Sequence, residues 1–241
     1  MGALLELEQV SKRYGALVVT DELSLTVGET EALGVLGPNG AGKTTLFNLI
    51  TGDTAPNAGR IMFGGREITA LPPHQRCRMG IGRSYQIPHP FSKMTVFENL
   101  VVAAIYGGDE TERESYRHCA DLLALTGLES RSNAVAGSLT LLQRKQLELA
   151  RALATKPRLL LLDEIGGGLT EHECQELIET IRGIRKSGIA IVWIEHIVHA
   201  LLAVVGRLIV VNFGAKLDDG EPRRVMENPA VQDVYMGISA E

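Results

Sequence analysis

The fold is decided by the stretch Gly37-Pro38-Asn39-Gly40-Ala41-Gly42-Lys43-Thr44-Thr45, which lies between two apolar segments, 32–36 and 46–50. Its spacing, G-x-x-x-x-G-K-T, is typical of a phosphate-binding loop (the P-loop, residues 37–45) that joins a strand to a helix. Glycines let the backbone approach a phosphate chain closely, and the positive end of the following helix faces the anion. We therefore predict that Lys43 contacts the outer phosphates of a nucleoside triphosphate and that Thr44 ligates Mg²⁺.

The segments around this loop predict an α/β fold with a P-loop NTPase core. Residues 4–10 and 17–27 alternate apolar with polar side chains, which is typical of antiparallel strands. Short apolar runs at 31–36, 159–162 and 189–194 have the pattern of buried parallel strands instead. We therefore expect a mainly parallel sheet, preceded along the chain by an N-terminal antiparallel β-subdomain.

The middle of the chain predicts an inserted α-helical subdomain. After a strand that is expected to end at Gln86, three helical patterns follow, at 96–106, 110–126 and 142–155. We assign residues 1–241 to a single domain. Its nucleotide-binding core, with the β-subdomain, comprises residues 1–86 and 156–241, and its helical subdomain comprises residues 87–155.

Composition and charge narrow the class of protein. A hydrophobic fraction of 45% and a charged fraction of 22% are ordinary for a soluble globular protein. The net charge of −5 and the aromatic fraction of 5% argue against a nucleic-acid partner. Three scattered cysteines, Cys77, Cys119 and Cys174, suit reduced thiols. We expect neither a signal peptide nor a membrane-spanning helix, so any membrane role would come through a partner.

Polar residues that follow buried strands are candidates for catalysis. Asp163 and Glu164 come directly after four leucines, so a parallel strand would deliver both carboxylates at its C-terminal end. We expect Asp163 to orient Mg²⁺ or its water, and Glu164 to act as general base toward the attacking water. The alternative for this pair is a core strand that meets a solvated turn. His196 follows the next buried strand and could donate to the γ-phosphate, although an isolated histidine there is more often structural.

Four features in this order and spacing resemble the nucleotide-binding subunit of an ATP-binding cassette (ABC) transporter: the P-loop, Gln86, Asp163-Glu164 and His196. The resemblance covers the whole chain and implies ATP hydrolysis, with ATP and Mg²⁺ as cofactors. It implies that Gln86 senses Mg²⁺ and the membrane partner, and that His196 is the switch histidine. It also implies that Tyr14 stacks on the adenine. The residues alone leave two alternatives open, adenine stacking or a structural role for Tyr14 in a turn at 11–15.

Shorter segments are similar to the ATPases of bacterial branched-chain amino acid importers, and more to the LivG-type subunit than to its LivF-type sister. These segments are FNLITG (47–52), RMGIGRSYQ (78–86), MTVFENL (94–100) and ENPAVQDVYMG (227–237). The resemblance implies a second ATPase subunit, with a heterodimer favoured, two membrane permeases and, indirectly, a periplasmic substrate-binding protein. It places the chain at the cytoplasmic face of the inner membrane. Urea and short-chain amide importers, and the lipopolysaccharide exporter ATPase, share much of this pattern, so the substrate stays open.

The signature motif departs from the family pattern. The usual L-S-G-G-Q aligns with Leu139-Thr140-Leu141-Leu142-Gln143, so leucines replace both glycines. In the family, backbone N–H groups of this motif cap the γ-phosphate bound to the opposite subunit, and leucine side chains are expected to crowd that approach. A second departure is Thr170, which replaces the usual aspartate at the end of the glycine-rich loop 166–170.

Two other functions stay open. A non-hydrolysing regulatory subunit is favoured only by the lost signature glycines, whereas Lys43, Thr44, Asp163, Glu164 and His196 are all present. A non-transport cassette protein of translation or repair would usually carry two fused cassettes or a long coiled-coil insert, and this sequence shows one cassette and no heptad run. ATP turnover together with a partner ATPase distinguishes the regulatory alternative from the leading one.

Overall fold

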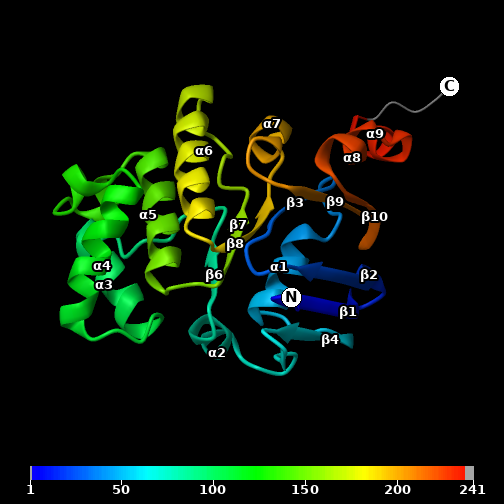
Figure 1. The fold of residues 1–241 in the computed structure, drawn as a ribbon, viewed down its shortest axis with the longest axis horizontal. Helices are drawn as coiled ribbons and strands as arrows, with labels where there is room; N and C mark the ends of the chain where they lie inside the picture. The colour runs from blue at the N-terminus through cyan, green and yellow to red at the C-terminus, as the bar shows by residue number, and fades with distance from the viewer. Residues whose placement is uncertain (1, 237–241) are drawn as a thin grey trace. The chain divides into compact units, whose positions relative to one another are not determined.

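The structure, a computed structural model, describes residues 2–236 and has the predicted α/β character. The chain forms two compact units. The first unit comprises the described residues up to Pro73 together with those from Ala190 onward, and the second comprises His74–Ile189. Figure 1 labels the helices and strands along the chain. The predicted helical segment 87–155 lies within the second unit, and its separation from a nucleotide-binding core stays a prediction.

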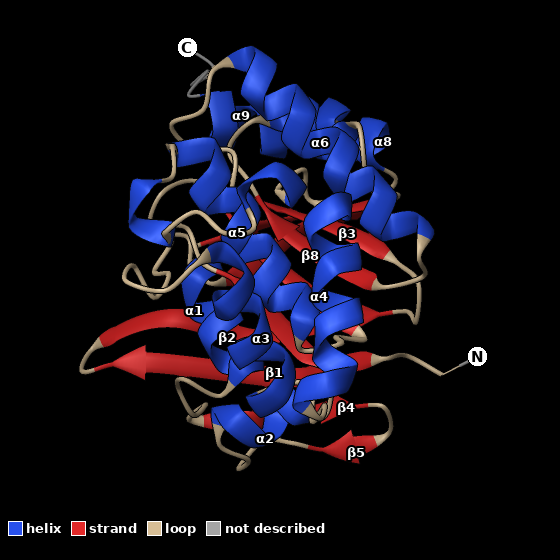
Figure 2. Ribbon diagram, turned by 90° about the vertical axis from the view of Figure 1, so that its left-hand side faces the viewer, coloured by secondary structure: helices blue, strands red, loops and turns tan. Residues whose placement is uncertain are grey.

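The first unit contains the antiparallel sheet, with strand order β2-β1-β4-β5. Its strands are β1 (Leu5–Tyr14), β2 (Leu17–Val27), β4 (Ala58–Phe63) and β5 (Arg66–Glu67). Figure 2 shows β1 and β2 as a long pair. The predicted turn at 11–15 is wrong: β1 runs on to Tyr14, which pairs with Leu17, so the turn shrinks to Gly15 and Ala16. Pairing with β2 keeps this polar segment extended, an effect that its composition does not reveal.

The first unit also holds strands in the order β10-β9-β3-β8. They are β3 (Ala32–Leu36), β8 (Ala190–Ile194), β9 (Arg207–Asn212) and β10 (Ala215–Gly220). Strand β3 is parallel to both β8 and β9, and β10 returns antiparallel to β9. Every residue of β3 and β8 is buried, as their uninterrupted apolar runs predict.

The helices of the first unit are α1 (Lys43–Thr51), α7 (Val198–Leu202), α8 (Pro222–Glu227) and α9 (Pro229–Met236). Helix α1 follows the P-loop, as predicted, and its C-cap is Gly52, whose left-handed conformation (φ 84°) suits glycine. The sequence did not predict α7, because five residues are too few to establish a helical period. The sequence predicts a helical tail over 222–241, and α8 and α9 lie within it. Its last part, 237–241, lies outside the described residues.

The second unit combines a parallel strand pair with helices. Strands β6 (Ile81–Ser84) and β7 (Leu159–Asp163) are parallel partners. The helices are α2 (Pro73–Arg78, whose first residue belongs to the first unit), α3 (Val96–Tyr106), α4 (Glu112–Leu125), α5 (Leu141–Ala154) and α6 (Glu171–Lys186). Helices α3, α4 and α5 pack against one another. Strand β6 ends at Ser84 rather than at the predicted Gln86, because its pairing with β7 stops where Ser84 faces Leu162.

Four helices of the second unit begin with the same capping box. In each, a threonine hydroxyl accepts a hydrogen bond from the N–H three residues on, and that residue's side chain accepts one from the threonine backbone. The pairs are Thr95 with Glu98, Thr111 with Glu114, Thr140 with Gln143, and Thr170 with Glu173. These bonds lower the pKa of the three glutamates. Among residues 2–236, no helix combines the length and the apolar character needed to cross a bilayer.

Candidate functional site

The P-loop joins β3 to α1 within the first unit, as predicted. Gly42 is the N-cap of α1 at φ 97° and supplies no side-chain cap, and the first helical turn carries no acidic residue. The Lys43 Nζ donates to the carbonyl oxygens of Gly37 at 2.7 Å and Pro38 at 2.9 Å, and Lys43 is only 5% exposed. A helix N-terminus without a capping side chain, beside a buried ammonium, fits a phosphate chain.

Two positions of the P-loop require glycine for packing, in addition to the close approach of a phosphate to the backbone. A Cβ on Gly37 would lie 2.2 Å from the carbonyl oxygen of Val211, and one on Gly42 would lie 2.3 Å from that of Val19. The loop is thus pressed against the backbones of β9 and β2, where no larger residue fits. A Cβ on Gly40 would meet nothing within 4 Å. Sequence reasoning assigned all the P-loop glycines to phosphate approach and missed this second constraint.

Two other predicted site residues belong to the same unit. In the parallel pair β3 and β8, Val35 is opposite Ile194, so His196 follows the strand edge from which the P-loop also emerges. Tyr14 ends β1 and is half exposed. The Nζ of Lys12 lies 5.1 Å from the centroid of the Tyr14 ring and donates to the carbonyl oxygen of Ala55 at 2.9 Å. The Lys12 ammonium thus lies over one face of the Tyr14 ring and restrains the ring by a cation–π contact.

Replacing Tyr14 with alanine is expected to weaken ATP binding by roughly 1–3 kcal/mol, the scale of base–aromatic stacking. The measurement compares the affinities for ATP and for inorganic tripolyphosphate, which lacks a base. Only the ATP affinity should fall, and Tyr106→Ala, which removes an exposed tyrosine of α3, serves as the control. Equal losses for both ligands would make Tyr14 a structural residue of the hairpin.

The predicted catalytic carboxylates lie in the second unit, at the end of β7. Glu164 has a left-handed backbone (φ 45°), and its Oε2 accepts a hydrogen bond from the Gln86 Nε2 at 2.6 Å. The Asp163 Oδ2 lies 2.6 Å from the Arg83 Nη2, and both side chains are at most 5% exposed. The structure therefore brings together Gln86, Asp163 and Glu164. Sequence reasoning missed Arg83, although an arginine inside a short buried strand requires an acidic partner.

The signature residues form the start of α5. Thr140 and Gln143 form the capping box of this helix, which fixes the orientation of its first N–H groups. The side chain of Leu142 is buried, whereas Leu141 is 44% exposed. The Cδ2 of Leu141 lies 3.2 Å from where a Cβ on Gly168 would be, so it reaches the glycine-rich loop after Glu164. The first departure from the family pattern thus lies beside the loop that ends at Thr170, the second departure.

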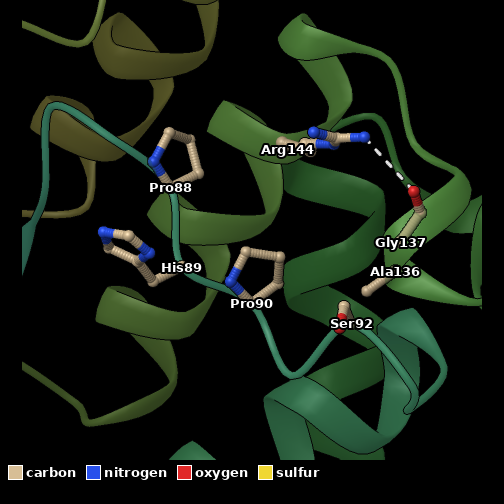
Figure 3. Close-up of a pocket in the computed structure, with 7 residues that line it drawn as sticks. All are labelled: Pro88, His89, Pro90, Ser92, Ala136, Gly137 and Arg144. Carbon is tan, nitrogen blue, oxygen red and sulfur yellow. Dashed lines mark hydrogen bonds between the residues drawn. The ribbon is translucent and has the colours of Figure 1, made fainter.

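A pocket of about 290 Å³ lies beside the segment that follows Gln86 (Figure 3). Its lining residues are Pro88, His89, Pro90, Ser92, Ala136, Gly137 and Arg144. Arg144 donates to the carbonyl oxygens of Leu139 at 2.9 Å and Gly137 at 3.2 Å, which ties the signature to this pocket. Nearby, Arg151 donates to the His89 carbonyl oxygen, and burial raises the pKa of the Glu148 carboxyl, an effect that Arg151 opposes.

Residues 20–166 match the protein family described as ABC transporter. The chain belongs to the ABC transporter family of ATPases. It is 35% identical, over 97% of its length and 98% of the relative's, to the "High-affinity branched-chain amino acid transport ATP-binding protein BraF" of Pseudomonas aeruginosa. LivG of Escherichia coli is 34% identical, and the same shares of both chains are covered. The "Lipopolysaccharide export system ATP-binding protein LptB" of Acidithiobacillus ferridurans is 36% identical over 98% of both chains.

Solved ABC ATPases have the same fold. The ADP conformation of an ATP-binding cassette from an ABC transporter superposes with a TM-score of 0.87 at 29% identity, covering 98% of this chain and 100% of that one. A nucleotide-free ATP-binding cassette superposes with a TM-score of 0.88 at 27% identity and covers all of both chains. The P-loop geometry described above is consistent with the ATP-binding role of this ABC ATPase.

The residues predicted to hold Mg²⁺ are of the types that ligate this ion. Among the described residues, no group of three or more His, Cys, Asp or Glu side chains could hold a metal ion. The predicted ligands are instead a hydroxyl, an amide and a carboxylate, from Thr44, Gln86 and Asp163. This set suits Mg²⁺, which is usually held by one or two carboxylates together with substrate phosphates.

Proposed function

We propose that this chain hydrolyses ATP to power an importer of branched-chain amino acids or related small amides. The observation that carries hydrolysis is the cluster of Asp163, Glu164 and Gln86 at the end of β7, with Glu164 held by the Gln86 amide. Import is supported by the 34–35% identity to BraF and LivG across nearly the whole chain. The relative LptB makes an exporter the second candidate.

Each predicted residue has a distinct part in this proposal. The P-loop backbone and Lys43 bind the phosphates, and Tyr14 stacks on the adenine. Thr44, Gln86 and Asp163 would ligate Mg²⁺, which as a Lewis acid neutralises charge that develops on the phosphates. Glu164 accepts the proton of the attacking water, and His196 donates a hydrogen bond toward the γ-phosphate.

The proposed assembly contains a second ATPase subunit, two membrane permeases and, through the permeases, a periplasmic binding protein; it contains no nucleic acid. The chain would sit at the cytoplasmic face of the inner membrane, held there by the permeases. Residues 87–155 would act as the helical subdomain of the single cassette. The pocket at Pro88–Ser92 follows Gln86 directly, so we place the permease contact there. The permease contact would then be linked to Glu164 through the hydrogen bond that the neighbouring Gln86 donates.

Reconstitution tests the proposal. The chain is assembled with its sister ATPase and permeases in liposomes that enclose ATP, and uptake of radiolabelled leucine is compared with uptake of urea and acetamide in the presence of the binding protein. ATP-dependent uptake of any of these solutes supports an importer. Lipopolysaccharide-stimulated ATPase activity without any uptake would instead make the chain an exporter subunit.

The leucine signature predicts two unequal ATP sites in the proposed heterodimer. The site on this chain's P-loop would be covered by the sister's signature, whereas the site on the sister's P-loop would be covered by Leu141 and Leu142 and would be slow. Because Leu142 is buried, the exposed Leu141 carries the obstruction. Loss of one backbone donor to a developing charge costs on the order of 10²–10³ in rate in other enzymes, so the difference should be measurable.

Leu141→Gly is therefore expected to raise turnover at the sister's site by about tenfold, since it removes one side chain without opening the core. The assay uses the heterodimer with the site on this chain's P-loop inactivated by Glu164→Gln. Leu125→Gly, at a comparably exposed leucine at the end of α4, is the control and should leave turnover unchanged. Full, cooperative ATPase activity of the purified chain alone would falsify the asymmetry.

A further inference from the structure

A pocket of about 320 Å³ lies within the first unit, in the antiparallel sheet. Its walls come from residues 11–13 of β1, from three residues of β2 and from residues 57–58, where β4 begins. The residues that line it in the described part of the chain include none that the proposed function assigns to ATP or Mg²⁺. Its volume is at the lower end of the range for small-molecule sites.

Thr20 brings a buried hydroxyl to this pocket. The residue is 2% exposed, and its Oγ1 has no hydrogen-bond partner within residues 2–236. Burying a hydroxyl without a hydrogen bond is costly, so few such groups are left unsatisfied in folded proteins. The hydroxyl of Ser11, which also lines the pocket, accepts a hydrogen bond from the N–H of Glu22 at 2.9 Å. Thr20 can therefore offer its hydrogen bond to a molecule in the pocket.

Two side chains of opposite charge, Arg13 and Asp21, line the same pocket. Within residues 2–236, neither side chain forms a hydrogen bond or an ion pair. Their backbones are fixed, because the Arg13 N–H donates to the Asn57 Oδ1 at 2.9 Å and the Asp21 N–H donates to the Gly214 carbonyl oxygen at 3.0 Å. Val18, which is opposite Arg13 in the sheet, adds apolar surface. The pocket thus offers a cation, an anion and an apolar wall.

Irregular strand pairing explains how neighbouring residues come to line one pocket. In a regular strand, adjacent side chains point to opposite faces of the sheet. The register of β1 with β2 shifts between Val10 and Lys12 and again between Lys12 and Arg13. Such bulges re-aim side chains and are frequent beside binding sites. Lys12 with Arg13, and Thr20 with Asp21, can therefore both contribute to the pocket.

We propose that this pocket binds a free α-amino acid with an apolar side chain. Arg13 would bind its carboxylate, Asp21 its ammonium group and the Thr20 hydroxyl a polar atom of either, while Val18 contacts its side chain. A simple anion would be repelled by Asp21 and a simple cation by Arg13, so a zwitterion suits the charges best. The inference goes beyond the proposed function, in which these four residues have no part.

Calorimetric titration of the full chain with L-leucine tests the proposal. We expect saturable binding with a dissociation constant below about 1 mM. Isocaproate lacks the ammonium group of leucine and isoamylamine lacks its carboxylate, so each should bind at least about tenfold more weakly. Absence of saturable leucine binding would overturn the proposal, as would isocaproate binding as tightly as leucine, which would make the pocket an anion site.

Variants locate the binding. Arg13→Gln and Asp21→Asn should each weaken leucine binding at least about tenfold, because each removes one charge-assisted hydrogen bond. Neither change alters the backbone hydrogen bonds of these residues. Arg117→Gln and Asp121→Asn, at exposed residues of α4, are the matched controls and should bind leucine as the wild type does. Wild-type leucine affinity in both pocket variants would place the binding elsewhere and overturn the proposal.

Thr20→Val has two expected effects of opposite sign. Valine keeps the shape of threonine, so the ligand-free thermal midpoint should rise by about 2–4 °C once the unpaired hydroxyl is gone. Leucine binding should weaken at least about threefold, because a hydrogen bond to the ligand is lost. A lower ligand-free midpoint would overturn the proposal, since it would show that the protein already satisfies the hydroxyl.

A final titration separates this pocket from the nucleotide site. With saturating ADP, the leucine affinity should stay within about threefold of its value without nucleotide. Competition between ADP and leucine would overturn the proposal, because the pocket would then be part of the nucleotide site. Leucine binding is measured without turnover, so failed ATPase or uptake assays would contradict the proposed function alone.

Discussion

Glu164→Gln is expected to stop ATP hydrolysis while leaving Mg·ATP binding in place. The amide cannot take a proton from the attacking water, and loss of a general base costs roughly 10²–10⁴ in rate. The glutamine is nearly the same size, and its amide oxygen can still accept the hydrogen bond that the Gln86 Nε2 donates to Glu164 at 2.6 Å. The local geometry should therefore be retained in the variant, so that the decrease in turnover reports the loss of proton transfer.

The measurement is steady-state phosphate release by the assembled transporter, with TNP-ATP binding measured in parallel. Glu171→Gln, which neutralises an exposed acid in the first turn of α6, is the matched control and should retain full turnover. Turnover of the Glu164→Gln variant within about threefold of the wild type would exclude Glu164 as the general base.

Lys43→Ala should have the second largest effect and should act on binding as well as on turnover. Lys43 is 5% exposed, and its ammonium donates to the carbonyl oxygens of Gly37 and Pro38. A phosphate bound there would lose a charge-assisted hydrogen bond worth about 1.5–3 kcal/mol, so ATP affinity should fall roughly 10–100-fold and hydrolysis should be lost. Equilibrium binding of TNP-ATP and phosphate release measure the two effects.

Because Lys43 also holds the loop together, the ligand-free thermal midpoint is measured for the same variant. Lys43→Met, which keeps most of the aliphatic side chain, helps to separate packing from charge. Lys93→Ala, at an exposed lysine, is the control and should bind ATP as the wild type does. Wild-type ATP affinity in Lys43→Met would contradict the assignment of the P-loop. If ATP affinity falls in Lys43→Ala but not in Lys43→Met, the loss comes from packing of the aliphatic side chain and not from its charge.

Some of the fold could be predicted because the signal is local in the chain. The strand, loop and helix around Lys43 follow from a glycine spacing between apolar runs, and α1 follows the loop as the sequence predicts. Helix α3 also has its predicted bounds, since the capping box of Thr95 and Glu98 lies within four residues. Strand ends were less predictable. Strands β1 and β6 end where their neighbours stop pairing with them, and the local sequence does not specify where a neighbouring strand ends.

The sequence by itself determined the type of chemistry: a lysine in a glycine-rich loop predicts the binding of a nucleoside triphosphate. The order of the motifs around this loop indicated an ABC ATPase, the family to which the chain belongs. Only the tertiary structure decided which residues support these groups. It pairs Arg83 with Asp163 across 80 positions and Gln86 with Glu164 across 78, and it turns Leu142 inward while leaving Leu141 exposed. Motifs can be read from the sequence because their spacing is local. Partners far apart in the chain depend on strand register and on the low tolerance of a buried charge for being unpaired, which arise only when the chain folds.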